Sequence, residues 1–488
     1  MLASIVFLPE AFTRWLLPKD ALFAIAAVAA SLTLPRGRLP RWVLVAMAAG
    51  ILLLLVGVAF SVSPWAAFWG RWPRYEGAVG LSAYLVAVWA GARLLGPGAG
   101  RGIRTFWSAS AVASAALGVI GVLESFGIDP IPTPWERPGS LAGNATDQGI
   151  LGLIFLAVLV LPAASAVRDA WAGRRRRQIA WALLLVAGAG FGLVTVAVSA
   201  SRGAFLGAVL VVLVLAALQV TSLGLRRPRG AGADAVAHRR RLVRGVLIAA
   251  GSLVLLVGVA LAVPLTRSRL LGLSPLSMTT VSDRVLIWQE SLAILAGRPF
   301  TGVGPSGFVD AAPAFQSAEW YASVGTSTTL DSPHNVLMQA GMAGGWPLAA
   351  LLAAVSIAIV MVGCRRWAAA IRTSVAERAL LLSGALAALL GTAAALMTSF
   401  TVPATALLCC LLVGVLVARP ATAAAVPGES AASAGRVTAS CVQETGVRDA
   451  RVRETGARVS RVRVGRAIRT GVLAVWAAFL VVCALAEL

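Results

Sequence analysis

The stretch QGILGLIFLAVLVLPAASA, residues 148–166, decides the fold class. It carries no charged side chain, and a run of roughly 20 apolar residues is long enough to cross a bilayer as a helix. Further runs of this kind recur along the chain and bring the number of candidate spans to twelve. The runs cover residues 20–34, 42–60, 77–95, 103–124, 148–166, 179–198, 204–223, 245–263, 334–363, 379–398, 403–418 and 470–488. The sequence therefore predicts an all-α, polytopic membrane protein with about 12 transmembrane helices.

Composition points the same way. Of the 488 residues, 59% are hydrophobic and 13% are charged, whereas soluble domains carry roughly 25% charged residues. This excludes a single water-soluble domain. Five cysteines are too few for a disulfide framework in a chain of this length. The two histidines, His238 and His334, are too few for most histidine-based metal sites, and we expect neither a metal nor another cofactor.

The loops between the runs alternate in charge. Six of them hold 32 of the 42 Lys and Arg residues but only 7 of the 20 acidic ones, so that they carry a net +25 and the rest of the chain −3. An excess of Lys and Arg marks the cytoplasmic face of a membrane protein. The overall charge of +22 therefore indicates orientation rather than nucleic-acid binding. The basic loops are residues 35–41, 93–104, 168–178, 224–244, 364–378 and 419–469.

We divide the chain accordingly. Residues 1–418 form the membrane domain, with the long outward segment 264–333 inserted in it. Residues 419–469 form a basic cytoplasmic linker, most simply disordered and drawn to anionic lipid, which contains the repeat ETGVRDARVR and ETGARVSRVR. Residues 470–488 form a last transmembrane helix.

The outward segment 264–333 is long for a loop, and such length is often functional. Apolar residues at helical spacing predict an amphipathic helix over 282–297, capped by Ser282 or Asp283, with Arg284 and Glu290 on its polar side. The following GRPFTGVGPSGF contains the spacing GxGxxG. A dinucleotide site would need a strand before it and a helix after it, so a rigid turn is the simpler interpretation, with backbone N–H groups that could contact an anion.

His334 is the one histidine of the outward face, at the mouth of a spanning helix. It is either an interfacial histidine satisfied by water or a general base, since histidine titrates near neutral pH. Asp331 lies three residues earlier and could orient the ring, and Asn335 follows directly. We include Asp331 and Asn335 among the candidate substrate-binding residues.

Outward arginines suit the binding of a phosphate, because the planar guanidinium can donate two parallel hydrogen bonds. Arg202 lies in SASRGAF, and Arg71 and Arg74 lie in GRWPRYEG with Glu76. Each arginine could instead reach the membrane interface or form a structural ion pair, such as Arg74 with Glu76. Several of them with one histidine, on a face poor in basic residues, favour an anion site beside a base.

These residues lie in segments that together resemble the O-antigen ligase and polymerase superfamily. The segments, in order, are RYEG (74–77), GSLAGNATDQGILGLIF (139–155), SRGAFLG (201–207), DRVLIWQESLAILAGRPFTGVGPSGF (283–308) and SPHNVLMQAGMAGGWPLAALL (332–352). The resemblance covers roughly residues 15–420 and is not specific to a substrate. It implies a fold related to the lipid-dependent glycosyltransferases.

The resemblance also implies an activity. Members transfer a glycan from a polyprenyl diphosphate to an acceptor hydroxyl or glycan on the outer face of the cytoplasmic membrane, without a metal. Carried over, Arg202 and Arg284 would bind the diphosphate and His334 would activate the acceptor, while Asn144 is expected to be structural. The partners would be a lipid-linked oligosaccharide, an acceptor and membrane lipids.

Two other classes of function stay open at this stage. A transporter of a small anion should have broken helices and charges near the membrane midplane, and the spans here have almost no charge at mid-helix. A non-catalytic cell-envelope assembly protein would not need the histidine and arginines.

Overall fold

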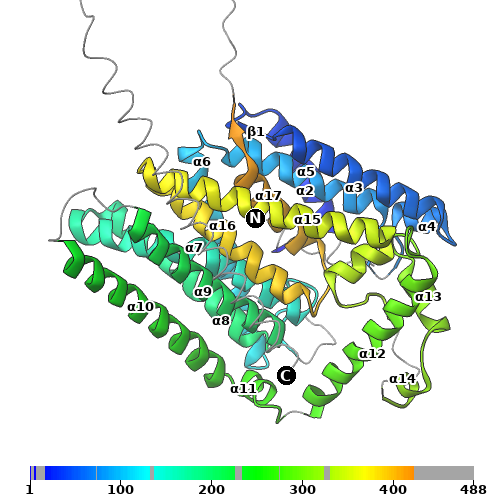
Figure 1. Ribbon diagram of the computed structural model, residues 1–488. Coiled ribbons are helices and arrows are strands. Elements are labelled where there is room, and N and C mark those ends of the chain that lie inside the picture. Colours follow the sequence, from blue (N-terminus) through cyan, green and yellow to red (C-terminus); the bar gives the residue numbers. More distant parts are fainter. Residues whose placement is uncertain are drawn as a thin grey trace, which may run out of the picture.

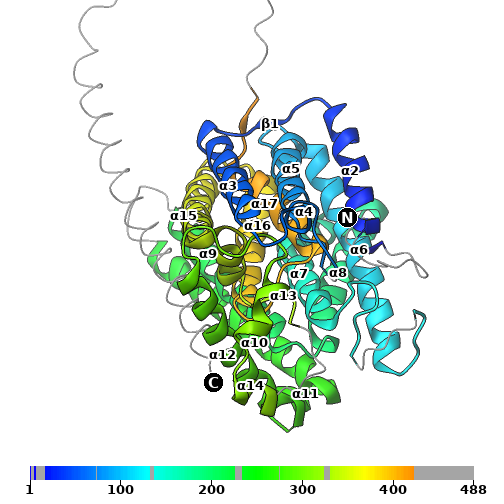
Figure 2. The same cartoon turned by 90° about the vertical axis from the view of Figure 1, so that its right-hand side faces the viewer.

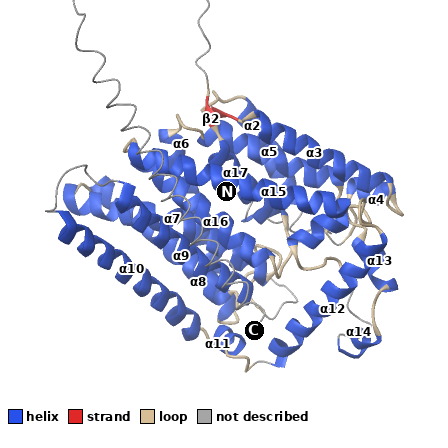
Figure 3. Ribbon diagram, in the orientation of Figure 1, coloured by secondary structure: helices blue, strands red, loops and turns tan. Residues whose placement is uncertain are grey.

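The computed structural model describes residues 1, 5–6, 17–72, 74–131, 137–225, 234–273, 275–323 and 330–421. Helices dominate these ranges (Figure 3). Nine helices in the described part are long and apolar enough to cross a membrane, and Pro403–Val417 is a shorter apolar helix. The all-α polytopic fold is therefore confirmed. The expected number of 12 spans is not, since 470–488 lies outside the described residues and 20–34 corresponds to a helix of 15 residues.

The described residues form seventeen helical elements and two short strands, most of which are labelled in Figure 1. The elements are α2 (Leu17–Ser31), β1 (Gly37–Arg38), α3 (Arg41–Ala59), α4 (Pro64–Trp69), α5 (Ala78–Leu95), α6 (Gly100–Ser125), α7 (Ala145–Gly173), α8 (Arg176–Val198), α9 (Arg202–Leu225), α10 (Asp234–Ala262), α11 (Pro264–Leu270), α12 (Pro275–Gly297), α13 (Phe308–Ala311), η1 (Ala312–Ala314), α14 (Ala318–Ser323), α15 (Val336–Arg372), α16 (Ala376–Leu396), α17 (Pro403–Val417) and β2 (Arg419–Pro420). β1 and β2 pair antiparallel, with Gly37 opposite Pro420.

Helices α7 and α16 form the centre of the bundle. In their most apolar windows 72% and 78% of the residues are buried, whereas the figure is 11% for the span of α10. The exposed side chains of α10 include Val246, Leu247 and Val254, as expected for a helix that faces lipid. Close packing of the inner layer depends on small residues, because a Cβ added to Gly207 on α9 would lie 2.6 Å from the carbonyl oxygen of Gly391 on α16.

Arginines of the basic loops donate hydrogen bonds to the last carbonyl groups of neighbouring helices. Arg93 donates from Nε to the carbonyl oxygen of Ala30 at 2.8 Å, at the end of α2. The buried Arg378 donates to the carbonyl oxygens of Leu95 (2.5 Å) and Val415 (2.7 Å), near the ends of α5 and α17. The last carbonyls of a helix have no partner within it. These arginines therefore cap helices at the end of the bundle that carries the basic loops.

The opposite end of the bundle carries the short helices. There α12 runs between α11 and α13 across the end of the bundle (Figure 1). Figure 2 looks onto this end, with α4 beside α13 and with α11, α12 and α14 below them. A separate small core, which includes Ile287, Leu295, Phe308, Trp320 and Met342, holds this part together.

Helix α15 is broken near its start. Gly344 (φ −156°) and Gly345 (φ +70°) leave the helical conformation, and Pro347 follows. The break leaves the carbonyl oxygen of Met342 free to accept from the N–H groups of Val303 (2.9 Å) and Gly304 (3.0 Å). The glycine-rich turn is thus bonded to α15, and these two N–H groups are not available to the anion that the sequence analysis considered.

Two expectations about the outward helix are wrong. The helix begins at Pro275, so Ser282 and Asp283 lie within α12 rather than at its start. Glu290 was expected on the polar side, but it is buried, and its Oε1 accepts from the N–H of Ser317 at 3.2 Å. Glu290 is buried because α12 packs against the segment 317–323, which includes Ser317 and Trp320.

We expect Arg378→Ala to destabilise the protein. It leaves two buried carbonyls without a donor, and hydrogen bonds of this charged type contribute about 1.5–3 kcal/mol each. Thermal unfolding in detergent should begin at a clearly lower temperature. Arg372→Ala, at an exposed end of α15, is the matched control and should leave the unfolding temperature unchanged; equal effects of both substitutions would contradict the capping role.

Candidate active site

The motif SRG places Arg202 at the beginning of α9. Ala200 adopts a left-handed conformation (φ +50°) that turns the chain out of α8. The Oγ of Ser201 then accepts from the N–H of Ala204 at 3.3 Å and caps the new helix. Gly203 packs against α16, where a Cβ would lie 3.1 Å from Oγ1 of Thr398. Arg202 therefore extends from a fixed helix N-terminus, which itself favours anions.

Helix α11 brings a second arginine to the same place. The buried Thr266 donates from its hydroxyl to the carbonyl oxygen of Ala197, near the end of α8. This anchors α11 next to the turn that precedes Arg202. Arg269, one turn later, is half-buried, and its Nε is a buried atom with no hydrogen-bond partner within the described ranges.

Four arginines act on one another here, and we call Arg137, Arg202, Arg269 and Arg284 the arginine cluster. Burial, followed by the charges of Arg269 and Arg284, lowers the pKa of Arg137. Burial, followed by Arg202 and Arg269, lowers the pKa of Arg284. Burial and Arg202 likewise lower the pKa of Arg269. Because an arginine stays protonated in a protein, the cluster concentrates positive charge.

Among the described residues, one acidic group opposes this charge on Arg284. The carboxylate of Asp283 raises the pKa of Arg284, but it ranks below burial and both arginines as a cause. Asp283 is also engaged by Ser323, whose hydroxyl donates to it at 2.9 Å. The arrangement suits a ligand that carries several negative charges.

His334 lies between the end of α12 and the turn 397–402. Its backbone is left-handed (φ +50°), and its N–H donates to Oγ of Ser332 at 3.1 Å. Trp288 of α12 fixes the preceding residue by donating to the carbonyl oxygen of Pro333 at 3.1 Å. The imidazole meets the Phe400 ring edge-on, with centroids 5.1 Å apart. A strained non-glycine residue at such a position is typical of functional sites.

The environment keeps the imidazole neutral. Burial, then Arg284, then Arg74 lower the pKa of His334 to about 3. Both charged groups that act on the ring are arginines, so the carboxylate expected to orient the ring, Asp331, is not among its electrostatic partners. A bound anion near Arg284 would oppose this shift and raise the pKa towards neutrality.

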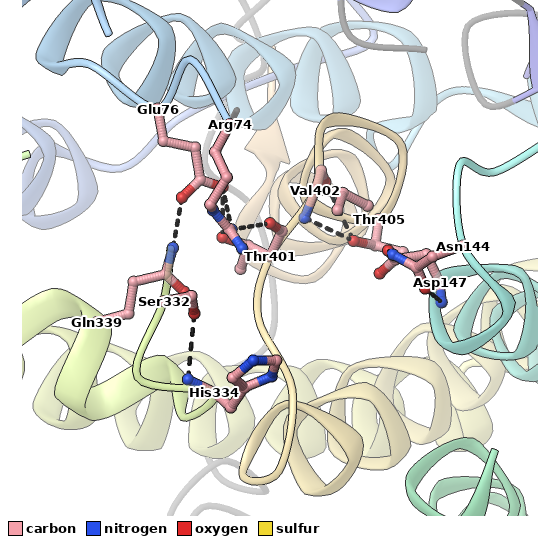
Figure 4. A network of polar contacts seen from close by, with 10 residues as sticks. All are labelled: Arg74, Glu76, Asn144, Asp147, Ser332, His334, Gln339, Thr401, Val402 and Thr405. Carbon is pink, nitrogen blue, oxygen red and sulfur yellow. Dashed lines mark hydrogen bonds and ion pairs between the residues drawn. The ribbon is translucent and has the colours of Figure 1, made fainter. Parts of the chain in front are cut away.

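On the other side of His334 lies a network without an excess of charge. Arg74 pairs with Oε1 of Glu76 at 2.9 Å and donates to the carbonyl oxygen of Thr401 at 2.5 Å. The amide of Gln339 and the hydroxyl of Thr401 also donate to Glu76. Figure 4 shows this network, with His334 beside it and the Asn144–Asp147 pair further away.

Arg71 and Arg74 are therefore separate from the arginine cluster. Arg71 pairs with Asp310 at 2.5 Å. Arg74 also lies over the ring of Phe400, with Cζ 4.1 Å from the centroid. The structural ion pair considered as the alternative for Arg74 is what the structure contains.

The two asparagines cap helices. Asn335 accepts at Oδ1 from the N–H groups of Leu337 and Met338, and donates to the carbonyl oxygen of Met397 at 3.1 Å. Its amide thus holds the start of α15 directly behind His334. Asn144 caps α7 by accepting from the N–H of Asp147 at 2.9 Å, in line with its expected structural part.

The sequence analysis missed Arg137 and Arg269. Arg137 lies in the segment before α7 and Arg269 on the short helix α11, and they join Arg202 and Arg284 only when these segments, α8 and α12 pack together. The charge asymmetry could have indicated both residues. The segments predicted to face outward hold few basic residues, so each of these residues was a candidate for the same anion-binding role as Arg202.

Comparison with known families agrees with this geometry. Residues 187–353 match a family model described as O-antigen ligase. Within residues 187–353 the chain is therefore similar to the O-antigen ligase family. The matched O-antigen ligase region contains three arginines of the cluster and His334, whereas Arg137 and the Arg74–Glu76 pair lie outside it. A search of the curated proteins finds no match to the chain.

The titration of His334 can be measured directly. In a His238→Ala background, ¹⁵N-histidine labelling reports His334 alone, since the chain holds two histidines. We expect a neutral imidazole down to pH 5, because burial and two arginines lower its pKa to about 3. Arg284→Gln should raise this pKa, although burial keeps it below 6.5.

The exposed Arg267 provides the control, since Arg267→Gln removes a charge from the same outer end and should leave the titration unchanged. An ordinary midpoint near pH 6.5 in the unsubstituted protein would contradict the described environment.

Proposed function

We propose that the chain transfers a glycan from a polyprenyl diphosphate to an acceptor hydroxyl on the outer face of the cytoplasmic membrane, as a ligase or a polymerase. The observation that carries this proposal is the arginine cluster beside a neutral histidine, in a polytopic chain similar to the O-antigen ligase family over residues 187–353. The membrane and its outer face follow from the charge asymmetry of the loops.

In this proposal the arginine cluster binds the diphosphate. A diphosphate offers several acceptor oxygens and spreads its charge over them, which matches guanidinium groups from different segments. The charge on the leaving oxygen grows as the glycosidic bond breaks, so fixed arginines stabilise the transition state more than the ground state. They supply the positive charge that a metal supplies in other phosphate sites, and the proposed reaction is metal-independent.

His334 takes the acceptor proton. The acceptor oxygen attacks the anomeric carbon and forms the new glycosidic bond. The bond between that carbon and the diphosphate oxygen breaks, and its electron pair leaves with the polyprenyl diphosphate. Attack opposite the diphosphate inverts the anomeric centre.

The low pKa of His334 fits this order of events. Before the donor binds, the imidazole is neutral but weakly basic. The negative diphosphate would neutralise Arg284 and raise the pKa of His334 towards the working pH, where a general base is most effective. The base thus becomes effective when the donor is present.

Replacing His334 with Ala should abolish transfer and leave folding intact. The measurement is mass spectrometry of products from a nanodisc preparation given a polyprenyl-diphosphate-linked oligosaccharide and an acceptor, with a chelator present in parallel. We expect glycan gain by the acceptor in the unsubstituted protein, with or without chelator, and none in the variant. Unchanged transfer in His334→Ala would remove the general-base role, and chelator inhibition reversed by a divalent ion would remove the metal-independent mechanism.

Arg269 and Arg267 lie on the same short helix and make a matched pair. Arg269 belongs to the arginine cluster, whereas Arg267 is exposed. We expect Arg269→Ala to weaken binding of polyprenyl diphosphate about tenfold or more, because a hydrogen bond to a charged group contributes about 1.5–3 kcal/mol. Arg267→Ala should bind like the unsubstituted protein.

Arg202→Lys and Arg284→Lys should each recover only part of the affinity that the Ala substitution removes, because an ammonium cannot donate two parallel hydrogen bonds. Full affinity in both Lys variants would contradict paired phosphate recognition.

A further inference from the structure

A cavity lies on the side of His334 away from the arginine cluster. Its volume is about 290 Å³, close to the lower end for small-molecule sites. It lies between the outward segment 71–76, the glycine-rich turn, and helices α3, α5 and α15. Pro333 and Val336, which flank His334, both line it, whereas no residue of the arginine cluster does.

The cavity is polar at one end and apolar at the other. Arg74, Glu76 and Asp331 lie at the end formed by the outward segments, and Leu81, Leu85, Leu348 and Leu352 line the part between the spanning helices. A ligand with a polar head at the membrane surface and a hydrocarbon part in the membrane fits this gradient.

Three buried side-chain atoms at the polar end have no hydrogen-bond partner among the residues that the structure describes: Arg74 Nη1, Ser306 Oγ and Gln339 Oε1. All three residues line the cavity. The first atom can only donate, the last can only accept, and a serine hydroxyl can do both. Buried polar atoms left unpaired are costly, so the set indicates a ligand that donates and accepts.

The set also discriminates between ligand classes. A phosphate or carboxylate only accepts and could not pair with Gln339 Oε1, while an ammonium only donates and could not pair with Arg74 Nη1. At this end Arg71 pairs with Asp310 and Arg74 pairs with Glu76, and Asp331 adds a further carboxyl group, so the cavity offers an anion no excess of positive charge. Sugar hydroxyls donate and accept without a charge.

Ser306 gives an independent sign of function. Its backbone is left-handed (φ +56°), although it is not glycine. Such a conformation costs roughly 1–3 kcal/mol and persists mainly where the surroundings demand it. Glycine would fit this position with less strain, so the hydroxyl is a reason for the serine.

We propose that this cavity binds the acceptor as a lipid-linked saccharide, with its sugar at Arg74, Ser306 and Gln339 and its hydrocarbon part between α3, α5 and α15. The assignment rests on the proposed transferase function. The acceptor hydroxyl would then approach from the cavity and the donor diphosphate would lie at the arginine cluster, so that the anomeric carbon between them can be attacked from the face opposite the leaving oxygen.

Photolabelling of the full chain in nanodiscs tests the site. The probe is an alkyl glucoside with a diazirine on its chain, and labelled peptides are identified by mass spectrometry. We expect saturable labelling of peptides from α3, α5 or α15. Ser306→Ala should lower the affinity of the probe about fivefold, the usual effect of one lost hydrogen bond, and Ala340→Phe should abolish labelling by filling the cavity.

Two substitutions serve as matched controls. Ala350→Phe places the same ring on an exposed part of α15, and Ser63→Ala removes an exposed outer hydroxyl; both should label like the unsubstituted protein. Equal labelling in Ala340→Phe and Ala350→Phe would overturn the site.

A second measurement separates the acceptor from the donor. Polyprenyl diphosphate should not compete with the probe, and its own dissociation constant should be the same in Ala340→Phe and the unsubstituted protein. Competition, or a weakened dissociation constant in Ala340→Phe, would assign the cavity to the donor's prenyl chain and overturn the proposal. If the unsubstituted protein bound no polyprenyl diphosphate at all, the transferase function would fail, while the labelling would still decide whether the cavity binds a glycolipid.

Discussion

The repulsion among four arginines at one end of the bundle is the constraint on which the rest of the site depends. Like charges shielded from water repel one another, and this repulsion is why, after burial, Arg202 and Arg269 lower the pKa of Arg284. Local anchors hold the charges in place: Ser201 caps the helix that carries Arg202, Thr266 ties α11 to α8, and Trp288 ties α12 to the segment before His334. The arginines are thus held in place before an anion binds. Binding of the anion relieves their mutual repulsion and requires little further ordering of the protein.

On the other side of His334, the break in α15 positions the glycine-rich turn that forms part of the cavity wall. A continuous helix would use the carbonyl of Met342 for its own hydrogen bonds, and Gly345 at φ +70° prevents this. The freed carbonyl holds Val303 and Gly304, and the turn that they begin carries Ser306 to the cavity. Asn335 fixes the start of the same helix. The backbone conformations of Gly344 and Gly345 therefore help to position both His334 and the wall of the cavity.

The sequence could predict those features that depend on short, continuous stretches of the chain. Apolar runs predicted the all-α polytopic fold, the charge alternation predicts a side for each loop, and the motif around Arg202 and the segment around His334 were identified from short stretches. The sequence identified only two of the four arginines of the cluster, because Arg137 in the segment before α7 and Arg269 on α11 join the other two only through tertiary packing. Asn335 and Asp331 look equally polar beside His334 in the sequence, yet Asn335 caps α15 and the arginines, not Asp331, act on the imidazole. The start of α12 was misplaced because Ser282 and Asp283 resemble a helix cap but continue a helix begun earlier.

The two sides of His334 differ in charge. In the proposed reaction this difference determines where each substrate binds. A diphosphate in the cavity would face Glu76 and Asp331 and would lie away from the arginine cluster, so the cluster is the more favourable position for the donor. A sugar at the arginine cluster would neutralise none of its charge, so the acceptor is directed to the cavity. With the donor in place, the charge that lowered the basicity of His334 is compensated, and proton removal from the acceptor becomes favourable. The same electrostatic contrast that selects the position of each substrate would therefore also keep the base weak until both substrates are bound.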